Sequence, residues 1–184
     1  MPNVCSVEID ETPFPEEDPL VYVERMASNK LHAAVASLCL QQTHKQCVVL
    51  ASDTTVIAKK RILGKPSSFD DYAEMMSLLS GAKHQVSTSF AIAALDECSV
   101  QKNYLETVTT DVFFRTLSSS EIKAYWETGE PADKAGGYGI QGVAAAFVER
   151  ISGSYSGVVG LPLMEVSKAL ESFDLPLFFA RKMK

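Results

Sequence analysis

Apolar residues recur at helical spacing in the first part of the chain. Asp18-Pro19 suits a helix start, because Asp caps free backbone amides and Pro tolerates the first helical position. We therefore predict a helix from this pair to about Leu40. Its predicted buried face consists of Leu20, Val23, Ala27, Ala34 and Leu38.

A second pattern is typical of buried strands. Cys47–Ala51 is too short for a helix and contains β-branched residues. The chain turns polar at Ser52–Thr55 before it becomes apolar again at Val56–Ala58. We therefore expect Asp53 to lie in a polar notch between two strand-like runs.

Two capping patterns predict further helices. Ser68 and Asp71 resemble a capping box, and the apolar stripe that follows them ends at Gly81. Ser118 and Glu121 repeat the pattern before a helix that stops at the Gly-Glu-Pro sequence of residues 129–131. Both segments are expected to begin at their serine.

The remaining segments alternate between strand and turn. His84–Leu95 and Tyr104–Leu117 are rich in β-forming residues and flank a polar turn at Asp96–Ser99, which predicts two long antiparallel strands. After the glycine-rich stretch Ala135–Gly142 we expect a strand from Val143 to Ile151. The last predicted helix runs along Leu163, Val166, Leu170 and Phe173.

This alternation predicts an α/β protein. With 184 residues, 46% of them hydrophobic, the chain is long enough to bury a core without disulfides. We expect one domain over residues 1–184. The four cysteines form no Cys-x-x-Cys pair, so we expect reduced thiols in a cytoplasmic protein.

Charge and hydropathy narrow the classes of partner. A formal net charge of -6 argues against binding long nucleic acid, which needs a broad basic surface. No stretch approaches the roughly 18 apolar residues of a membrane span, and the first residues lack the pattern of a signal peptide. A single nucleotide, bound by a few lysines and a metal, remains compatible with this composition.

Lys30 is the first candidate for chemistry, because it shares the apolar stripe of the first helix with Ala27 and Ala34. A charge on such a stripe needs compensation. On spacing alone, the favoured interpretation is a side chain that snorkels past the core to water. The alternative is a lysine that points into a cleft to meet phosphate.

Carboxylates offer a second kind of chemistry. Asp53, at the end of a strand-like run, is suited to orienting a water molecule or holding a metal, and equally to capping a turn. Glu11 follows Asp10 before a Pro-rich turn, where it would supply an oxygen ligand to a hard cation such as Mg²⁺. Acidic pairs beside prolines are more often solvated loops.

Two glycine-containing segments complete the set. Gly64-Lys65-Pro66 lacks the upstream glycine and following hydroxyl of a Walker loop, so Lys65 is either a point charge for phosphate or part of a surface turn. In Ala135–Gly142 the absent side chains let backbone amides approach an anion or a base, although tight turns use glycine equally. Lys134 would add a polar contact, and Gln141 is able to read a base edge.

Together these segments resemble the Maf family of nucleotide pyrophosphatases, in order from about Val7 to Leu163. Several motifs in one order are far more specific than any one of them. The matching segments are Glu8–Glu11, Ala27–Lys30, Ala51–Val56, Ile62–Pro66, Leu79–His84, Gly129–Gly142 and Val158–Pro162.

The resemblance implies a Maf/ITPase-like fold, in which helices flank a mixed twisted sheet and two lobes enclose a deep cleft. It implies a homodimer that hydrolyses a nucleoside triphosphate to the monophosphate and pyrophosphate with Mg²⁺ or Mn²⁺. Asp53-Thr54 and the later Asp-Lys-Ala-Gly-x-Tyr-Gly-Ile-Gln-Gly segment are similar to the branch that acts on dTTP, UTP and some modified pyrimidine nucleotides.

On this basis we expect Asp53 and Glu11 to hold the metal and the attacking water, with Asp53 as the general base. Lys30 and Lys65 would offset charge on the phosphates. The expected substrate-binding residues are Thr54, Lys134 and Gln141.

The family also has a strand and a Ser-x-Ser-Pro-Arg-Arg loop, and the sequence starts downstream of both. We therefore expect a sheet without that strand and a phosphate site without its bidentate arginines. The alternative function is a non-catalytic nucleotide-binding regulator, suggested also by the family's association with cell-division arrest. A plain scaffolding protein would explain neither the lysine on an apolar stripe nor the clustered glycines.

Overall fold

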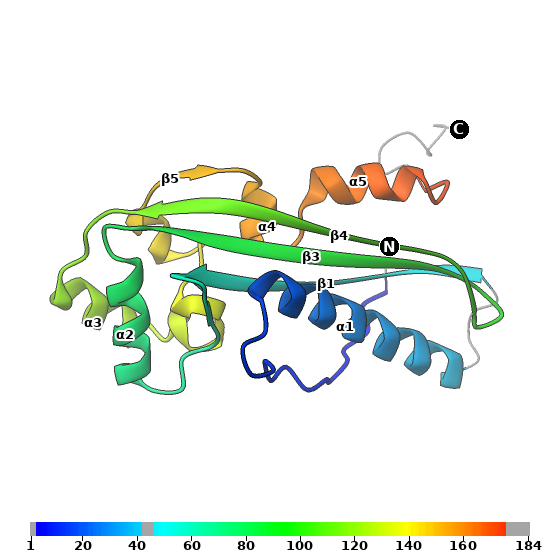
Figure 1. The fold of residues 1–184 in the computed structure, drawn as a ribbon, viewed down its shortest axis with the longest axis horizontal. Helices are drawn as coiled ribbons and strands as arrows, with labels where there is room; N and C mark the ends of the chain where they lie inside the picture. Colours follow the sequence, from blue (N-terminus) through cyan, green and yellow to red (C-terminus); the bar gives the residue numbers. More distant parts are fainter. Residues whose placement is uncertain (1–2, 42–45, 176–184) are drawn as a thin grey trace.

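The computed structural model describes residues 3–41 and 46–175, and its centre is one five-stranded sheet of order β2-β1-β3-β4-β5 (Figure 1). Helices flank this sheet, which confirms the α/β class. Every pairing between the described strands is antiparallel, where a mixed sheet was expected. Tight turns between β1 and β2 and between β3 and β4 require this direction for two of the four pairings. The strands are β1 (Gln46–Ala58), β2 (Arg61–Leu63), β3 (Lys83–Asp96), β4 (Ser99–Phe114) and β5 (Val148–Ser152).

The predicted helices begin at the expected caps. The Ser68 side chain accepts a hydrogen bond from the Asp71 amide, and Ser118 with Glu121 forms a complete capping box. The α-helices are α1 (Pro19–Gln41), α2 (Phe69–Leu79), α3 (Ser119–Glu127), α4 (Tyr155–Val159) and α5 (Leu163–Glu171). Three 3₁₀ segments follow α3, namely η1 (Glu130–Asp133), η2 (Ala135–Gly137) and η3 (Val143–Phe147).

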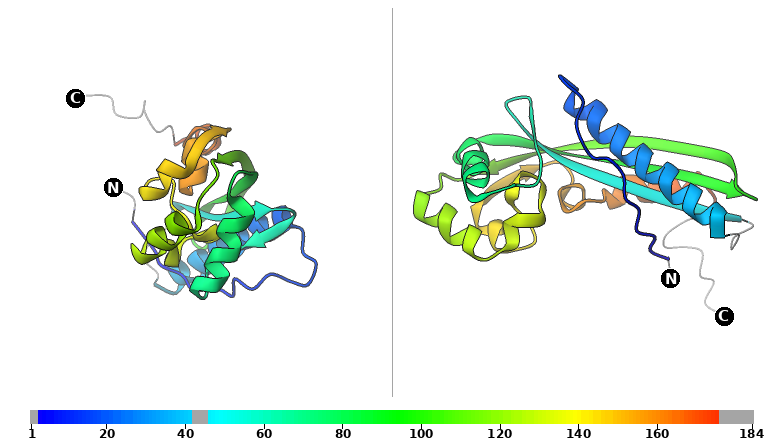
Figure 2. Two further views of the ribbon diagram at one scale, coloured as in Figure 1. Left: turned by 90° about the vertical axis from the view of Figure 1, so that its left-hand side faces the viewer. Right: turned by 90° about the horizontal axis from the view of Figure 1, so that it is seen from below.

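The long strands pack differently at their two ends. Towards the β3–β4 turn, α1 lies on one face of the sheet and α5 on the other (Figures 1 and 2). Alternate residues of β3 serve the two faces, because Ala91 and Ala93 pack with α1 while Phe90 and Ile92 pack with α5. At the opposite end, α2, α3 and the 3₁₀ segments cover the sheet around a separate apolar cluster.

Two predicted elements differ from the structure. Asp53 lies inside one continuous strand, since β1 pairs with β3 throughout and places Asp53 opposite Ser89. The strand expected from Val143 to Ile151 begins as the 3₁₀ segment η3 and becomes β5 only at Val148. Its buried residues, Ala144 and Phe147, are three apart, which matches the repeat of a 3₁₀ turn.

The expectation of reduced thiols is wrong for one pair of cysteines. Cys39 and Cys98 form a disulfide, with their Cα atoms 5.5 Å apart across a sequence separation of 59. The pairing arises because the end of α1 reaches the turn between β3 and β4. Within the residues that the structure describes, no helix is both long enough and apolar enough to cross a membrane.

Candidate active site

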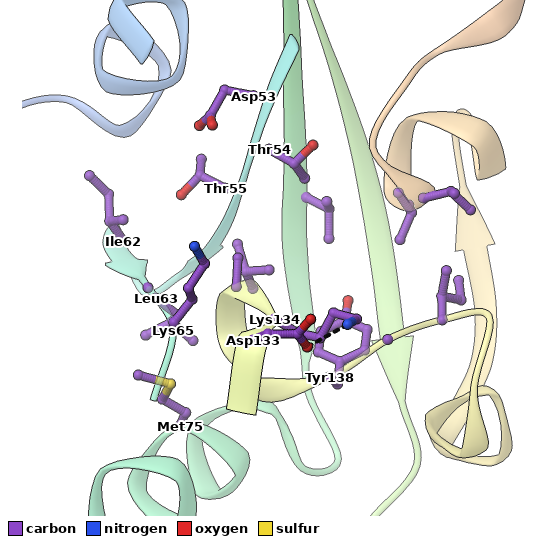
Figure 3. A pocket seen from close by; sticks show the side chains of 18 of the residues that line it. Asp53, Thr54, Thr55, Ile62, Leu63, Lys65, Met75, Asp133, Lys134 and Tyr138 are labelled. Carbon is purple, nitrogen blue, oxygen red and sulfur yellow. Dashed lines mark hydrogen bonds and ion pairs between the residues drawn. The ribbon is translucent and has the colours of Figure 1, made fainter. Parts of the chain in front are cut away.

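A cavity of about 960 Å³ is lined by every catalytic, metal-binding and substrate-binding residue that the sequence analysis proposed. Strand β1, the turn after β2 and the loop after η2 form its walls, and Figure 3 shows Asp53 at one end and Lys134 with Tyr138 at the other. The nominated residues that line it are Glu11, Lys30, Asp53, Thr54, Lys65, Lys134 and Gln141. The structure therefore brings together segments spread over most of the chain.

Lys30 joins two carboxylates at one side of this cavity. Its Nζ lies 2.5 Å from Asp53 Oδ1 and 2.7 Å from Glu11 Oε1. The exposed fractions of the side chains are 23% for Lys30, 11% for Asp53 and 43% for Glu11. Lys30 therefore points into the cavity and pairs its charge there, so the snorkelling interpretation is wrong.

The pKa values of the two carboxylates in this cluster are shifted in opposite directions. Burial raises the pKa of Asp53 above that of an ordinary aspartate, although Lys30 opposes the shift. The hydrogen bond from Lys30 lowers the pKa of Glu11. Burial lowers the pKa of Lys30, but its hydrogen bonds to Asp53 and Glu11 outweigh this and leave the pKa raised. Lys30 is therefore a cation at neutral pH, while the two carboxylates shift in opposite directions, with the pKa of Asp53 raised and that of Glu11 lowered.

The segment that carries Glu11 is fastened to α1. Tyr22 Oη donates a hydrogen bond of 2.9 Å to the Glu11 carbonyl. Arg25 donates to the Thr12 carbonyl at 3.1 Å and forms an ion pair of 2.6 Å with Glu17. Figure 2 shows this segment running back beside α1. Since α1 also carries Lys30, one helix positions both partners of the Lys30–Glu11 pair.

Lys65 lies farther from the cluster. Its Nζ is 3.8 Å from Glu11 Oε2, and 62% of its side chain is exposed. The residue follows β2, where the Gly64 carbonyl accepts a hydrogen bond of 2.9 Å from the Gly136 amide. That bond ties the turn of Lys65 to the glycine-rich loop across the cavity.

Thr54 presents an oriented hydroxyl to the cavity. Thr88 Oγ1 donates its single hydrogen to the Gly157 carbonyl at 2.7 Å. The 2.8 Å hydrogen bond between the two threonines must then be donated by Thr54. The Thr54 oxygen keeps its lone pairs for accepting a hydrogen bond.

Glycine is required where the loop after η1 crosses the sheet and α2. Gly136 has a φ of +67°, and a Cβ there would lie 2.9 Å from three side-chain atoms of Val56. Gly137 has a φ of +71°, and its Cβ would lie 2.8 Å from the Tyr72 ring. The two glycines therefore let the loop lie directly on β1 and α2.

Beyond these glycines, the cavity wall combines buried neutral side chains with a paired lysine. Tyr138 is buried, and its Oη lies 2.7 Å from His84 Nε2. Burial lowers the pKa of His84 to about 4, so the imidazole is neutral. Lys134 is paired with Asp133 at 2.5 Å, while Gln141 is exposed at the cavity's edge.

Sequence reasoning missed several residues that hold the site together. Tyr22 falls within the predicted first helix, and Thr88 and His84 fall within a predicted strand, without any local feature that marks them as functional. Glu130 stood out only as part of a helix stop and of the family segment Gly129–Gly142, and Tyr125 only as part of the helix that begins at Ser118. Apart from the grouping of His84 and Glu130 with family motifs, the sequence carried no signal for these contacts, because they are made across the fold.

Comparison with known proteins identifies the family. A family model described as Maf-like protein matches residues 1–173. The dTTP/UTP pyrophosphatase of Hahella chejuensis is 47% identical over 176 residues, covering 96% of this chain and 84% of the relative. The dTTP/UTP pyrophosphatase of Aliivibrio fischeri is 46% identical over 93% of this chain and 86% of the relative, and that of Pseudoalteromonas atlantica is 46% identical over 94% and 86%. The chain belongs to the Maf family.

Proposed function

We propose that this chain hydrolyses dTTP- or UTP-type nucleoside triphosphates to the monophosphate and pyrophosphate. Relatives that are 42–47% identical are named dTTP/UTP pyrophosphatases, which supports this substrate class. The observation that carries the proposal is the Lys30 ammonium held between Glu11 and Asp53 inside a nucleotide-sized cavity. Such a cluster combines a cation for phosphate with a carboxylate able to accept a proton.

Asp53 is the proposed general base. Burial raises its pKa above that of an ordinary aspartate, which favours proton uptake, and the hydrogen bond from Lys30 favours its ionised form. Asp53 would take a proton from water as the water oxygen bonds to the α phosphorus. The bond from that phosphorus to the α–β bridging oxygen breaks, and pyrophosphate leaves.

Lys30 and Lys65 are proposed to stabilise negative charge on the phosphates. Lys30 is oriented by two carboxylates, so it is already in place when substrate binds. Lys65 is largely exposed and is able to swing from Glu11 to a phosphate oxygen. We expect Lys30 to contribute more to the rate, because less reorganisation is needed.

Glu11 and Asp53 are also the residues that would hold Mg²⁺ or Mn²⁺. Among the described residues, no group of three or more His, Cys, Asp or Glu side chains gathers in the way a metal cage requires. Two carboxylates still fit Mg²⁺, which usually takes one or two from the protein and its other ligands from phosphate and water. When bound, the ion would polarise the phosphate oxygens that it contacts.

Thr54, Lys134 and Gln141 are proposed to position the substrate. The Thr54 hydroxyl is oriented as an acceptor, so it suits a donor on the nucleotide. Gln141 offers both a donor and an acceptor to a base edge. Lys134 would exchange its exposed partner Asp133 for a phosphate or ribose oxygen.

Pyrophosphate release by the purified chain tests the proposal. The substrates are dTTP, UTP, CTP and 7-methyl-GTP with Mg²⁺ or Mn²⁺. We expect release from dTTP and UTP that requires the metal. A folded chain that binds these nucleotides without releasing pyrophosphate would instead be the non-catalytic regulator. The family resemblance also supports a homodimer, which sedimentation of the same sample checks.

A further inference from the structure

A tyrosine and a carboxylate close the loop that carries Gln141. The Gly139 amide donates a hydrogen bond of 3.1 Å to Tyr125 Oη, and Tyr125 Oη lies 2.7 Å from Glu130 Oε1. The Val143 amide donates a bond of 3.1 Å to Glu130 Oε2. The two ends of the loop are thus connected through one hydroxyl and one carboxylate.

These hydrogen bonds, which we call the Tyr125–Glu130 relay, each have a defined donor and acceptor. The Gly139 amide supplies its own hydrogen to the tyrosine oxygen, and a carboxylate accepts only. The phenol hydrogen of Tyr125 therefore goes to Glu130. Burial raises the pKa of Tyr125, so this donor stays protonated at neutral pH. Both oxygens of Glu130 are engaged, one by the phenol and one by the loop.

The Glu130 carboxylate lies directly against the backbone of Gly142. A Cβ atom placed on Gly142 would overlap both carboxylate oxygens of Glu130. The φ of Gly142 is -102°, which any residue can adopt, so backbone conformation does not require glycine here. Glycine is required by the space that the carboxylate occupies.

Ile140, Gln141 and Gly142 lie between the anchored amides of Gly139 and Val143, and all three line the cavity. We propose that Tyr125 and Glu130 are positioning residues that set this loop and thereby govern discrimination between nucleotide bases. The proposal rests on the proposed function and deepens it. The ion cluster of Lys30 belongs to other elements, so turnover at saturation should depend little on this relay.

The first test measures base discrimination in Tyr125→Phe and Glu130→Gln. We expect the ratio of kcat/KM for UTP over CTP to fall about tenfold, mainly through KM, because a lost hydrogen bond lets the loop move. Tyr72→Phe is the matched control, since it removes a buried hydroxyl that donates to the Ile122 carbonyl. A lower kcat with an unchanged ratio in both variants would overturn the proposal.

A second test does not depend on turnover. Amide hydrogen exchange should rise about tenfold at Gly139 in Tyr125→Phe and at Val143 in Gly142→Ala, which displaces the Glu130 carboxylate. Unchanged exchange at both amides would overturn the proposal. If the wild-type chain releases no pyrophosphate, the proposed function fails, and the UTP-to-CTP ratio is then taken from dissociation constants.

Discussion

The two sides of the cavity are held in place by different means. On the proposed phosphate side, Lys30 comes from a 23-residue helix with its own backbone hydrogen bonds, and Asp53 comes from a 13-residue strand that is paired with β3. On the base side, Gln141 lies in a loop that depends on Tyr125, Glu130 and the Tyr138–His84 pair. Regular elements place Lys30 and Asp53, whereas the segment of Glu11 and the loop of Gln141 need specific side chains to hold one geometry.

The two sides also differ in electrostatics. The proposed phosphate side is a cluster in which the Lys30 cation contacts two carboxylates. On the proposed base side the partly exposed Lys134 is paired with Asp133, while burial keeps His84 uncharged and holds the pKa of Tyr138 and Tyr125 above the ordinary tyrosine value. Substitutions on the first side should therefore change the rate, and those on the second should change selectivity or stability.

The largest expected effect is that of Asp53→Asn. Removing the proposed base should lower kcat about 10²–10⁴-fold, measured as pyrophosphate release from UTP. Asp111→Asn is the control, because Asp111 pairs with Lys83 on the surface away from the cavity. A folded Asp53→Asn protein with full turnover would disprove the assignment.

A comparison of Lys30→Met with Lys65→Met tests whether the oriented lysine contributes more to turnover than the exposed one. Lys30→Met should lower kcat/KM by about 10²–10³-fold, because it removes an oriented cation and leaves two carboxylates together. Lys65→Met should cost less, since most of its side chain is exposed. Equal losses in the two variants would contradict the idea that preorganisation distinguishes these lysines.

Burial of His84 should make the stability of the folded protein decrease as the pH falls. Its pKa is about 4 when folded and near 6.5 when unfolded, so the unfolded chain binds the extra proton between these values. The free energy of unfolding should fall by up to about 3 kcal/mol as pH drops from 6.5 to 4. Chemical denaturation at several pH values measures this, with His84→Gln expected to flatten the slope. The same slope in His84→Gln and in the exposed control His32→Gln would rule out the assignment.

The smallest effect is expected for Gln141→Ala. Loss of a base contact should reduce the UTP-to-CTP ratio of kcat/KM by about tenfold with little change in kcat. Gln101→Ala, on the exposed start of β4, serves as the control. An unchanged ratio would show that Gln141 does not read the base.

Local signals in the sequence predicted most of the elements. The start of α1 follows from Asp18-Pro19, and the starts of α2 and α3 follow from Ser68 and Ser118, because a cap involves residues within one turn. The long antiparallel strands β3 and β4 were predicted from their β-forming composition. Lys30 was predicted as a candidate residue because helical spacing places its charge on an apolar face.

Contacts between residues far apart in the sequence determined the features that local sequence patterns did not predict. Asp53 lies within a strand because β3 pairs across its polar run, and η3 replaces a strand partly because Glu130 holds the Val143 amide. The disulfide joins residues 59 apart. The sequence by itself determined most of the elements, the family and the candidate side chains, since these depend on neighbours along the chain and on motifs in their order. Only the tertiary structure decided that Lys30 lies between Glu11 and Asp53, because contacts between distant residues depend on how whole elements pack.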